Sequence, residues 1–167
     1  PGNCLIDQWI RKKSKKIFDK DGKIAKSGKI NKIILNKALK NYKTKNKVSF
    51  DIKDFDLSFV NSLSLKDGAA TLTEYTAQIL VQNLTIHTLD NVKIILCGGG
   101  RKNKFLIKKI KQKIPYSVFS IDDYGINGDF IESQAFAYLA IRSYLKLPIS
   151  FPVTTGCKYP CSGGLIV

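Results

Sequence analysis

The chain has 167 residues, of which 44% are hydrophobic and 25% charged, and its formal net charge is +15. This length and composition predict one folded domain with a hydrophobic core and exclude an intrinsically disordered protein. No apolar run approaches the roughly 20 residues of a membrane-spanning helix, and the first residues lack the pattern of a signal peptide. We therefore expect a cytoplasmic protein without a membrane partner.

The positive charge by itself suggests a nucleic-acid partner. However, only three of the 28 basic residues are arginine, namely Arg11, Arg101 and Arg142, and the lysines are scattered along the chain. Proteins that read bases and phosphates usually use the planar fork of arginine. We therefore expect solvated lysines that attract anionic ligands, and no specific nucleic-acid partner.

The four cysteines contain no Cys-x-x-Cys pair, and the chain has a single histidine, His87. This set argues against a zinc site, so we predict no metal-ligating residues. In a cytoplasmic protein the cysteines are expected as reduced thiols, and Cys97 is expected as a small buried core residue.

Helices dominate the first half of the chain. Helical spacing of apolar residues predicts one helix over residues 4–16, with Trp9 in the core, and a second that contains Ile30 to Leu39. Between them, residues 19–22 (Asp-Lys-Asp-Gly) predict a turn. Residues 40–51 are polar and are expected to form a loop, and the longest helix is expected over residues 66–87.

A strand, three glycines and a helix follow one another in the second half. Val92 to Cys97 predict a buried parallel strand, the glycines at 98–100 leave a bare backbone, and Asn103 is placed to cap a helix over 104–113. Such a turn is where α/β proteins hold nucleotides, although a tight structural turn is an equally good interpretation. The pattern is neither a Walker loop nor a Rossmann fingerprint.

A second short parallel strand is expected over residues 117–121, followed by a helix from about Asp129 to Leu145 that ends before Pro148 and Pro152. The chain is thus α/β with two predicted strands. Two parallel strands do not make a whole sheet. Either the chain contains further strands without a recognisable pattern, or the rest of the sheet lies on a segment that this chain lacks.

Several short motifs occur in one order along the whole chain. They are Pro1-Gly2-Asn3, Asp19–Gly22, Ala25–Gly28, Ala70–Ala77, Cys97–Asn103, Gly125–Glu132 and Ala135–Ala140. This succession resembles the C-terminal half of the anhydro-N-acetylmuramic acid kinase family. Each motif is weak by itself, and the order and spacing together are specific.

The resemblance implies an α/β fold, the ribonuclease-H-like C-terminal lobe of a two-lobed actin-like ATPase, with residues 1–167 as one nucleotide-binding lobe and an incomplete sheet. It implies ATP and Mg²⁺ as cofactors, and a homodimer in the intact enzyme. The implied reaction opens the 1,6-anhydro ring of anhydro-N-acetylmuramic acid with water and phosphorylates O6, a step of cell-wall recycling. The catalytic aspartate is expected three residues before Pro1, and the N-terminal lobe is expected upstream or on a separate partner chain. This chain alone is therefore expected to be inactive.

The resemblance also assigns site residues. Gly98, Gly99, Gly100 and Asn103 match the nucleotide-binding segment, Glu132 matches a glutamate that places the water or the sugar, and Asn3 matches a substrate-binding position. Two local alternatives stay open. Glu132 with Asp129 has the spacing of a helix cap, and Asn3 is equally suited to cap the first helix.

The sequence departs from the family pattern at two positions. Val48 stands where the family carries lysine, and Ile52 where it carries arginine. The loss of two cations, together with the expected absence of the first lobe, leaves two alternatives to an enzyme part. They are a non-enzymatic basic binding module and the remnant of a split gene.

Overall fold

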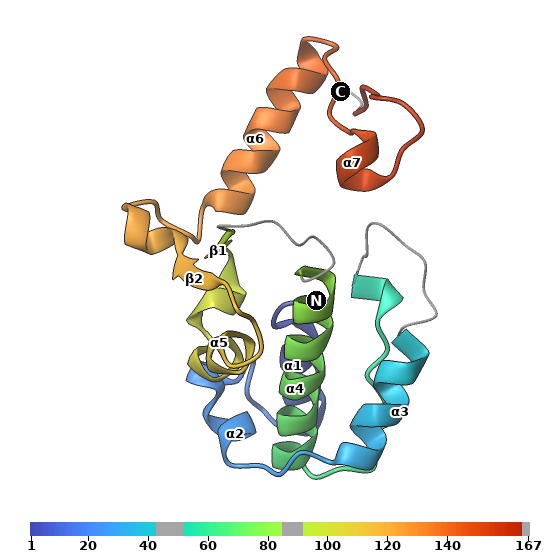
Figure 1. Ribbon diagram of the computed structural model, residues 1–167, viewed down its shortest axis with the longest axis vertical. Helices are drawn as coiled ribbons and strands as arrows, with labels where there is room; N and C mark the ends of the chain where they lie inside the picture. The colour runs from blue at the N-terminus through green and yellow to red at the C-terminus, as the bar shows by residue number, and fades with distance from the viewer. Residues whose placement is uncertain (43–51, 85–91, 165–167) are drawn as a thin grey trace.

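The computed structural model describes residues 1–42, 52–84 and 92–164, and Figure 1 shows their arrangement. Helices form most of the molecule, and one two-stranded parallel sheet lies beside them. The expected α/β class is therefore confirmed. Within the described residues, none of the helices is both long enough and apolar enough to cross a membrane.

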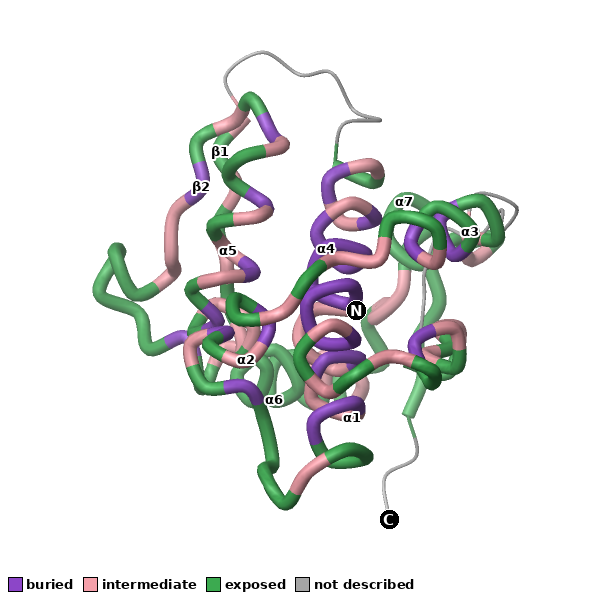
Figure 2. The backbone as a smooth tube through the Cα atoms, turned by 90° about the horizontal axis from the view of Figure 1, so that it is seen from below, coloured by how far each residue is buried: buried purple, intermediate pink, exposed green. Residues whose placement is uncertain are grey.

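The long helix α4 (Leu65–Leu84) is the centre of the packing. It contacts α1 (Cys4–Lys13), α2 (Lys23–Lys26), α3 (Lys32–Tyr42) and α5 (Lys104–Lys111). Every residue from Gly68 to Ala77 is buried, and most of them are glycine, alanine or threonine; Figure 2 shows this helix as the most continuously buried element. The small side chains among them let the neighbouring helices approach α4 closely.

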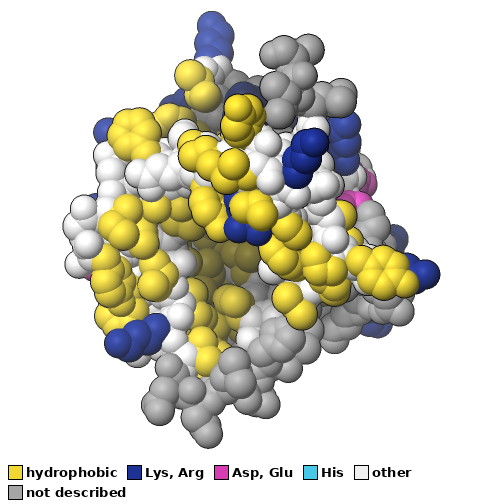
Figure 3. Space-filling view, turned by 90° about the horizontal axis from the view of Figure 1, so that it is seen from above, with side chains coloured by type: hydrophobic (Ala, Val, Ile, Leu, Met, Phe, Trp, Pro, Cys, Tyr) yellow, Lys and Arg dark blue, Asp and Glu magenta, His cyan; other side chains and the backbone are white. Residues whose placement is uncertain are grey.

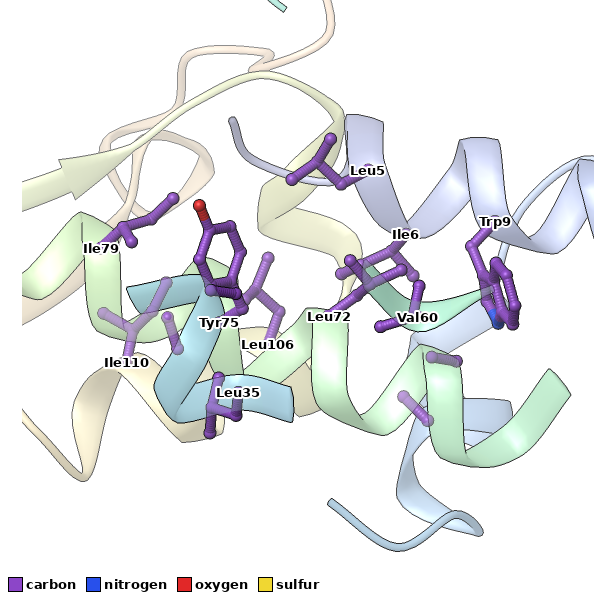
Figure 4. Close-up of a cluster of buried hydrophobic side chains, with 14 of the residues drawn as sticks. Leu5, Ile6, Trp9, Leu35, Val60, Leu72, Tyr75, Ile79, Leu106 and Ile110 are labelled. Carbon is purple, nitrogen blue, oxygen red and sulfur yellow. The ribbon is translucent and has the colours of Figure 1, made fainter. Parts of the chain in front are cut away.

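Trp9 of α1 packs against α4 and is fully buried, as expected (Figure 4). Its indole Nε1 donates a hydrogen bond to the Leu65 carbonyl at 2.9 Å. Gly68 lies directly under the ring, and a Cβ atom at this position would overlap the indole. The contact therefore requires glycine at this point of α4.

A buried ionic contact joins α4 to α5. The Glu74 carboxylate lies 2.6 Å from Nζ of Lys113 and 3.2 Å from Nζ of Lys109, and it accepts a hydrogen bond from Gln78 at 2.9 Å. Burial acts to raise the pKa of Glu74, but these three partners outweigh it and hold the pKa below its ordinary value.

The sheet consists of β1 (Lys93–Leu96) and β2 (Ser117–Ser120), paired in parallel with Ile94 opposite Val118. The expectation of a buried strand ending in a buried cysteine is wrong. Ile95 is 46% exposed and Cys97 is exposed, whereas Ile94 and Leu96 pack against the core. One face of this two-stranded sheet is covered and the other is open.

The C-terminal part extends away from the helices (Figure 1) and consists of α6 (Ile131–Tyr144) and the short α7 (Pro152–Thr155). Neither helix has a buried residue. Hydrophobic side chains spread over this end of the molecule, around a hollow (Figure 3). The most exposed hydrophobic residues of this part are Val153, Tyr144, Tyr159 and Phe136.

Most predicted helices lie within a few residues of the observed ones, and residues 85–91, which include His87, lie outside the described range. Short 3₁₀ turns and α2 escaped the sequence analysis because they are too short to show periodicity. The 3₁₀ turns span Lys20–Gly22, Ile52–Asp54, Ser58–Val60, Gly99–Lys102 and Ile121–Tyr124.

The Trp9 contact predicts that Gly68→Ala destabilises the chain by about 1–3 kcal/mol, although alanine favours a helix, because the added methyl group overlaps the indole. Urea unfolding followed by the fluorescence of the single tryptophan measures the change. Gly99→Ala is the matched control and is expected to be neutral, since nothing lies within 4 Å of its Cβ position. Equal stability of the two variants would contradict the observed packing of α1 on α4.

The Glu74 contact predicts a pH-dependent stability. Because the folded-state pKa is lowered, the contribution of Glu74 is present above the ordinary glutamate pKa of 4.5 and is lost as the pH falls below it. Glu74→Gln is expected to cost about 1–2 kcal/mol at neutral pH, and the difference from the unchanged chain is expected to shrink in acid. Glu132→Gln, at an exposed position, serves as the control and is expected to show no such trend.

Candidate functional site

Five of the six sequence-predicted site residues line one pocket of about 580 Å³. Asn3 comes from the start of α1, Gly99, Gly100 and Asn103 from the turn after β1, and Glu132 from the first turn of α6. The structure thus brings together residues that are up to 129 positions apart, from Asn3 to Glu132. Gly98 lies at the start of the same turn but is not among the lining residues.

The glycine turn leaves its backbone open. Gly98 has φ 71° and ψ −178°, a conformation that is essentially restricted to glycine. A Cβ atom at Gly98 or Gly99 would meet nothing within 4 Å, so no neighbouring group requires a small residue there. Tight packing against the described residues therefore does not explain the glycine at 99.

Asn103 joins the turn to α1. Its side chain is 1% exposed, and its Oδ1 accepts the hydrogen bond of the Leu106 N–H at 3.0 Å, which confirms the predicted cap of α5. Its Nδ2 donates to Oδ1 of Asn3 at 2.9 Å. Gly22 leaves room for this arrangement, because a Cβ there would overlap both Asn103 and Phe105.

Asn3 does not cap α1 with its side chain. The structure instead uses its carbonyl, which accepts the Asp7 N–H at 2.9 Å, and leaves the side chain paired with Asn103 at the pocket. The capping alternative for the Asn3 side chain is therefore wrong. Its predicted contact with a substrate stays a prediction.

Glu132 is exposed in the first turn of α6 and lines the pocket. The alternative, in which Asp129 and Glu132 cap α6, is not observed, because Asp129 pairs with two basic side chains. Its carboxylate lies 2.7 Å from Nη1 of Arg101 and 2.5 Å from Nζ of Lys102, and α6 begins after Phe130 without a side-chain cap. Glu132 therefore faces the pocket without the partner that the local interpretation assigned to it.

Arg101 holds the glycine turn against the loop before α6, and sequence analysis missed it. The guanidinium, whose side chain is 6% exposed, donates to both carboxylate oxygens of Asp122 at 2.6 and 3.0 Å, to Asp129 at 2.7 Å and to the Gly98 carbonyl at 2.9 Å. This bidentate arrangement holds the pKa of Asp122 well below its usual range, with help from the Ser120 hydroxyl.

The same loop is fixed from the other side by Gly128. Its N–H donates to Asp122 at 3.1 Å, its carbonyl accepts the Gly98 N–H at 3.1 Å, and a Cβ there would overlap the guanidinium of Arg101. A signal existed in the sequence, since one of only three arginines follows the glycines directly and acidic residues follow the second strand.

Three further acidic residues line the pocket, namely Asp7, Asp19 and Asp21. The buried Asp19 accepts the N–H groups of Ile24 at 2.8 Å and Ala25 at 2.9 Å, so its carboxylate caps α2. Asp7 is half-buried; burial raises the pKa of its carboxyl, and nearby Arg11 only partly offsets this. The Asp19 carboxylate is therefore occupied by two backbone N–H groups. The Asp7 carboxyl is easier to protonate than an ordinary aspartate.

The described residues contain no group of three or more His, Cys, Asp or Glu side chains that could hold a metal ion. Within them, the side chains of the pocket do not provide the oxygen cage of a dedicated Mg²⁺ site. The bare glycine backbone, the pocket and the nearby Lys102 do fit a nucleotide.

The model of the anhydro-N-acetylmuramic acid kinase family matches this sequence from residue 1 to residue 167. The chain belongs to that family. Similar proteins carry the name anhydro-N-acetylmuramic acid kinase in Pelagibacter ubique (50% identical over 100% of this chain), Zymomonas mobilis (38% over 99%) and Caulobacter vibrioides (38% over 100%).

The chain spans about half the length of these relatives, 46–47% of each. That share states how much of a kinase is present and not which part, so the placement in the C-terminal half and the division into lobes stay predictions. Of the two departures from the family pattern, Val48 lies outside the described residues. Ile52 is described and is 52% exposed.

The clamp of Arg101 predicts that Arg101→Ala loosens the segment from Ile121 to Phe130 together with the glycine turn. Faster hydrogen exchange of these backbone amides, measured by mass spectrometry, is the expected result, and Arg101→Lys is expected to be intermediate because lysine lacks the fork. The matched control is Arg142→Ala, since that guanidinium binds the Pro148 carbonyl and the Tyr138 hydroxyl. Unchanged exchange in Arg101→Ala would show that the ion pairs do not hold the loop.

Proposed function

We propose that this chain is the nucleotide-binding part of an anhydro-N-acetylmuramic acid kinase. The observation that carries the proposal is the convergence of Asn3, the glycine turn, Asn103 and Glu132 on one pocket, in a chain whose whole length matches the family. Each of these residues was assigned from the sequence, and three separate segments contribute them.

The glycine turn is the proposed contact for ATP. The backbone of Gly98, Gly99 and Gly100 packs against the adenosine and the neighbouring phosphate, and Asn103 holds the turn in place through the cap of α5. Lys102 lines the pocket with its ammonium group paired to Asp129, and the net charge of +15 favours the approach of an anion.

The proposed reaction is the opening of the 1,6-anhydro ring by water with phosphorylation of O6, which gives N-acetylmuramic acid 6-phosphate. Phosphoryl transfer depends on positioning and charge neutralisation, and ATP supplies the phosphoryl group when bound. Glu132 is the residue of this chain that orients the water or the sugar, and Asn3 is the proposed sugar contact. The general base that takes the proton of the water comes from the part of the kinase outside this chain.

Mg²⁺ is expected of such a kinase, but the described residues do not form a site for it, so its ligands would be phosphate oxygens, water and the rest of the enzyme. The open sheet face at Ile95 and the exposed apolar side chains of α6 support a further part of the protein that covers them. That part, a homodimeric assembly and a cytoplasmic location remain proposals, and so does the inactivity of the chain by itself.

Isothermal titration of the chain with ATP tests the nucleotide site. Gly99→Val is expected to weaken ATP binding at least about tenfold, because the added side chain projects from the open turn without disturbing the fold. The matched control is Ser62→Val, which alters a second pocket of about 590 Å³ between α3 and the region before α4. An equal loss in both variants, or a loss in the control alone, would contradict the site.

The turnover assay is separate. With ATP, Mg²⁺ and anhydro-sugar, product is expected from this chain joined to the remainder of a kinase and not from the chain alone. Product from the chain alone would refute the external base. If the chain binds DNA with a steep salt dependence and never binds ATP, the basic binding module replaces the kinase proposal.

A further inference from the structure

The segment after α6 closes into a loop. The N–H groups of Ile149 and Ser150 donate to the Cys161 carbonyl at 2.9 and 3.2 Å, and the Cys161 N–H donates to the Ser150 carbonyl at 3.0 Å. Residues 151–160 lie between these two paired positions and include α7. Cys161 therefore sits at the closed base of the loop, where it is exposed.

Cys157 lies on the same loop, directly after α7. Gly156 ends that helix in the left-handed region, with φ 72°, and its N–H donates to the Pro152 carbonyl at 3.0 Å. Just before it, the Thr155 hydroxyl hydrogen-bonds to the Ser150 hydroxyl. Ser150 is thus bonded both to Cys161 and to Thr155, which brings the two cysteine-bearing segments together.

The surroundings of Cys157 favour its thiolate. The hydroxyl of Thr155, then that of Ser150 and the thiol of Cys161, stabilise the charged form and lower the pKa of the Cys157 thiol. Cys4 is the opposite case, because burial raises the pKa of its thiol. The thiolate is the reactive form in disulfide exchange, so these cysteines differ in reactivity.

We propose that Cys157 and Cys161 form a dithiol site that low-molecular-weight disulfides, such as glutathione disulfide, oxidise reversibly to an intramolecular disulfide. The Cys157 thiolate attacks one sulfur of the small disulfide, forms a mixed disulfide and releases one small thiolate. The Cys161 thiolate then attacks Sγ of Cys157 and releases the second. Two protein thiols are oxidised and one small disulfide is reduced to two thiols, which balances the reaction.

The experiment uses the reduced chain with glutathione disulfide at mildly alkaline pH, followed by acid quench, alkylation and mass spectrometry. The expected product has lost two hydrogens. Trypsin cleaves after Lys158, so the peptides 147–158 and 159–167 are expected to stay linked until dithiothreitol separates them. A stable glutathione adduct on the unchanged chain, a link that involves Cys4 or Cys97, or a link between two chains would each overturn the proposal.

Three variants and one condition make the test specific. The double variant Cys4→Ser with Cys97→Ser is expected to react like the unchanged chain, and Cys161→Ser is expected to stop at the glutathione adduct of Cys157. Cys157→Ser is expected to form a glutathione adduct at Cys161, and to form it more slowly. Because the folded loop preorganises the two thiols, ring closure in urea is expected to be about tenfold slower. Equal rates in the folded and unfolded chain would show that the fold does not build the site.

Discussion

The packing of other helices around α4 is the constraint on which the rest of the structure depends. Trp9 lies over Gly68 and fixes α1, and Glu74 holds Lys109 and Lys113 and fixes α5. Both contacts involve buried groups of α4, so α1 and α5 have defined positions relative to each other. That geometry is the reason that the start of one helix and the start of the other meet at the pocket.

The site that results has a firm part and an open part. The hydrogen bond between Asn3 and Asn103 joins residues that are 100 positions apart, and Arg101 joins the glycine turn to the loop before α6. The Cβ positions of Gly98 and Gly99 stay free of neighbours. A bare turn held by a fully bonded frame suits a ligand that approaches the backbone, because the frame keeps the turn in shape before binding.

The exposed apolar surfaces of this chain are consistent with its covering less than half the length of its relatives. The open face of β1 and the apolar residues of α6 are unusual for a complete domain, because buried sheets and amphipathic helices normally bury such groups. The chain spans less than half the length of the kinases that it matches. Under the proposed function, the remainder of the kinase covers this open face of the sheet.

The sequence by itself determined the elements whose signal is local. The helices, the strand followed by glycines, the cap by Asn103 and the buried Trp9 follow from residue periodicity and side-chain type within a few neighbouring positions. The family and the five residues that the structure brings to one pocket were also predicted, because the motifs keep their order along the chain.

Only the tertiary structure decided which partner each polar group takes. Asp129 pairs with Arg101 and Lys102, although its spacing to Glu132 left a helix cap open as an alternative, and the Asn3 side chain binds Asn103 and does not cap its own helix. Cys97 and Ile95 are exposed although their strand looks buried in the sequence. The physical reason is the same in each case: burial and pairing depend on what distant segments bring close, and local spacing carries no information about that.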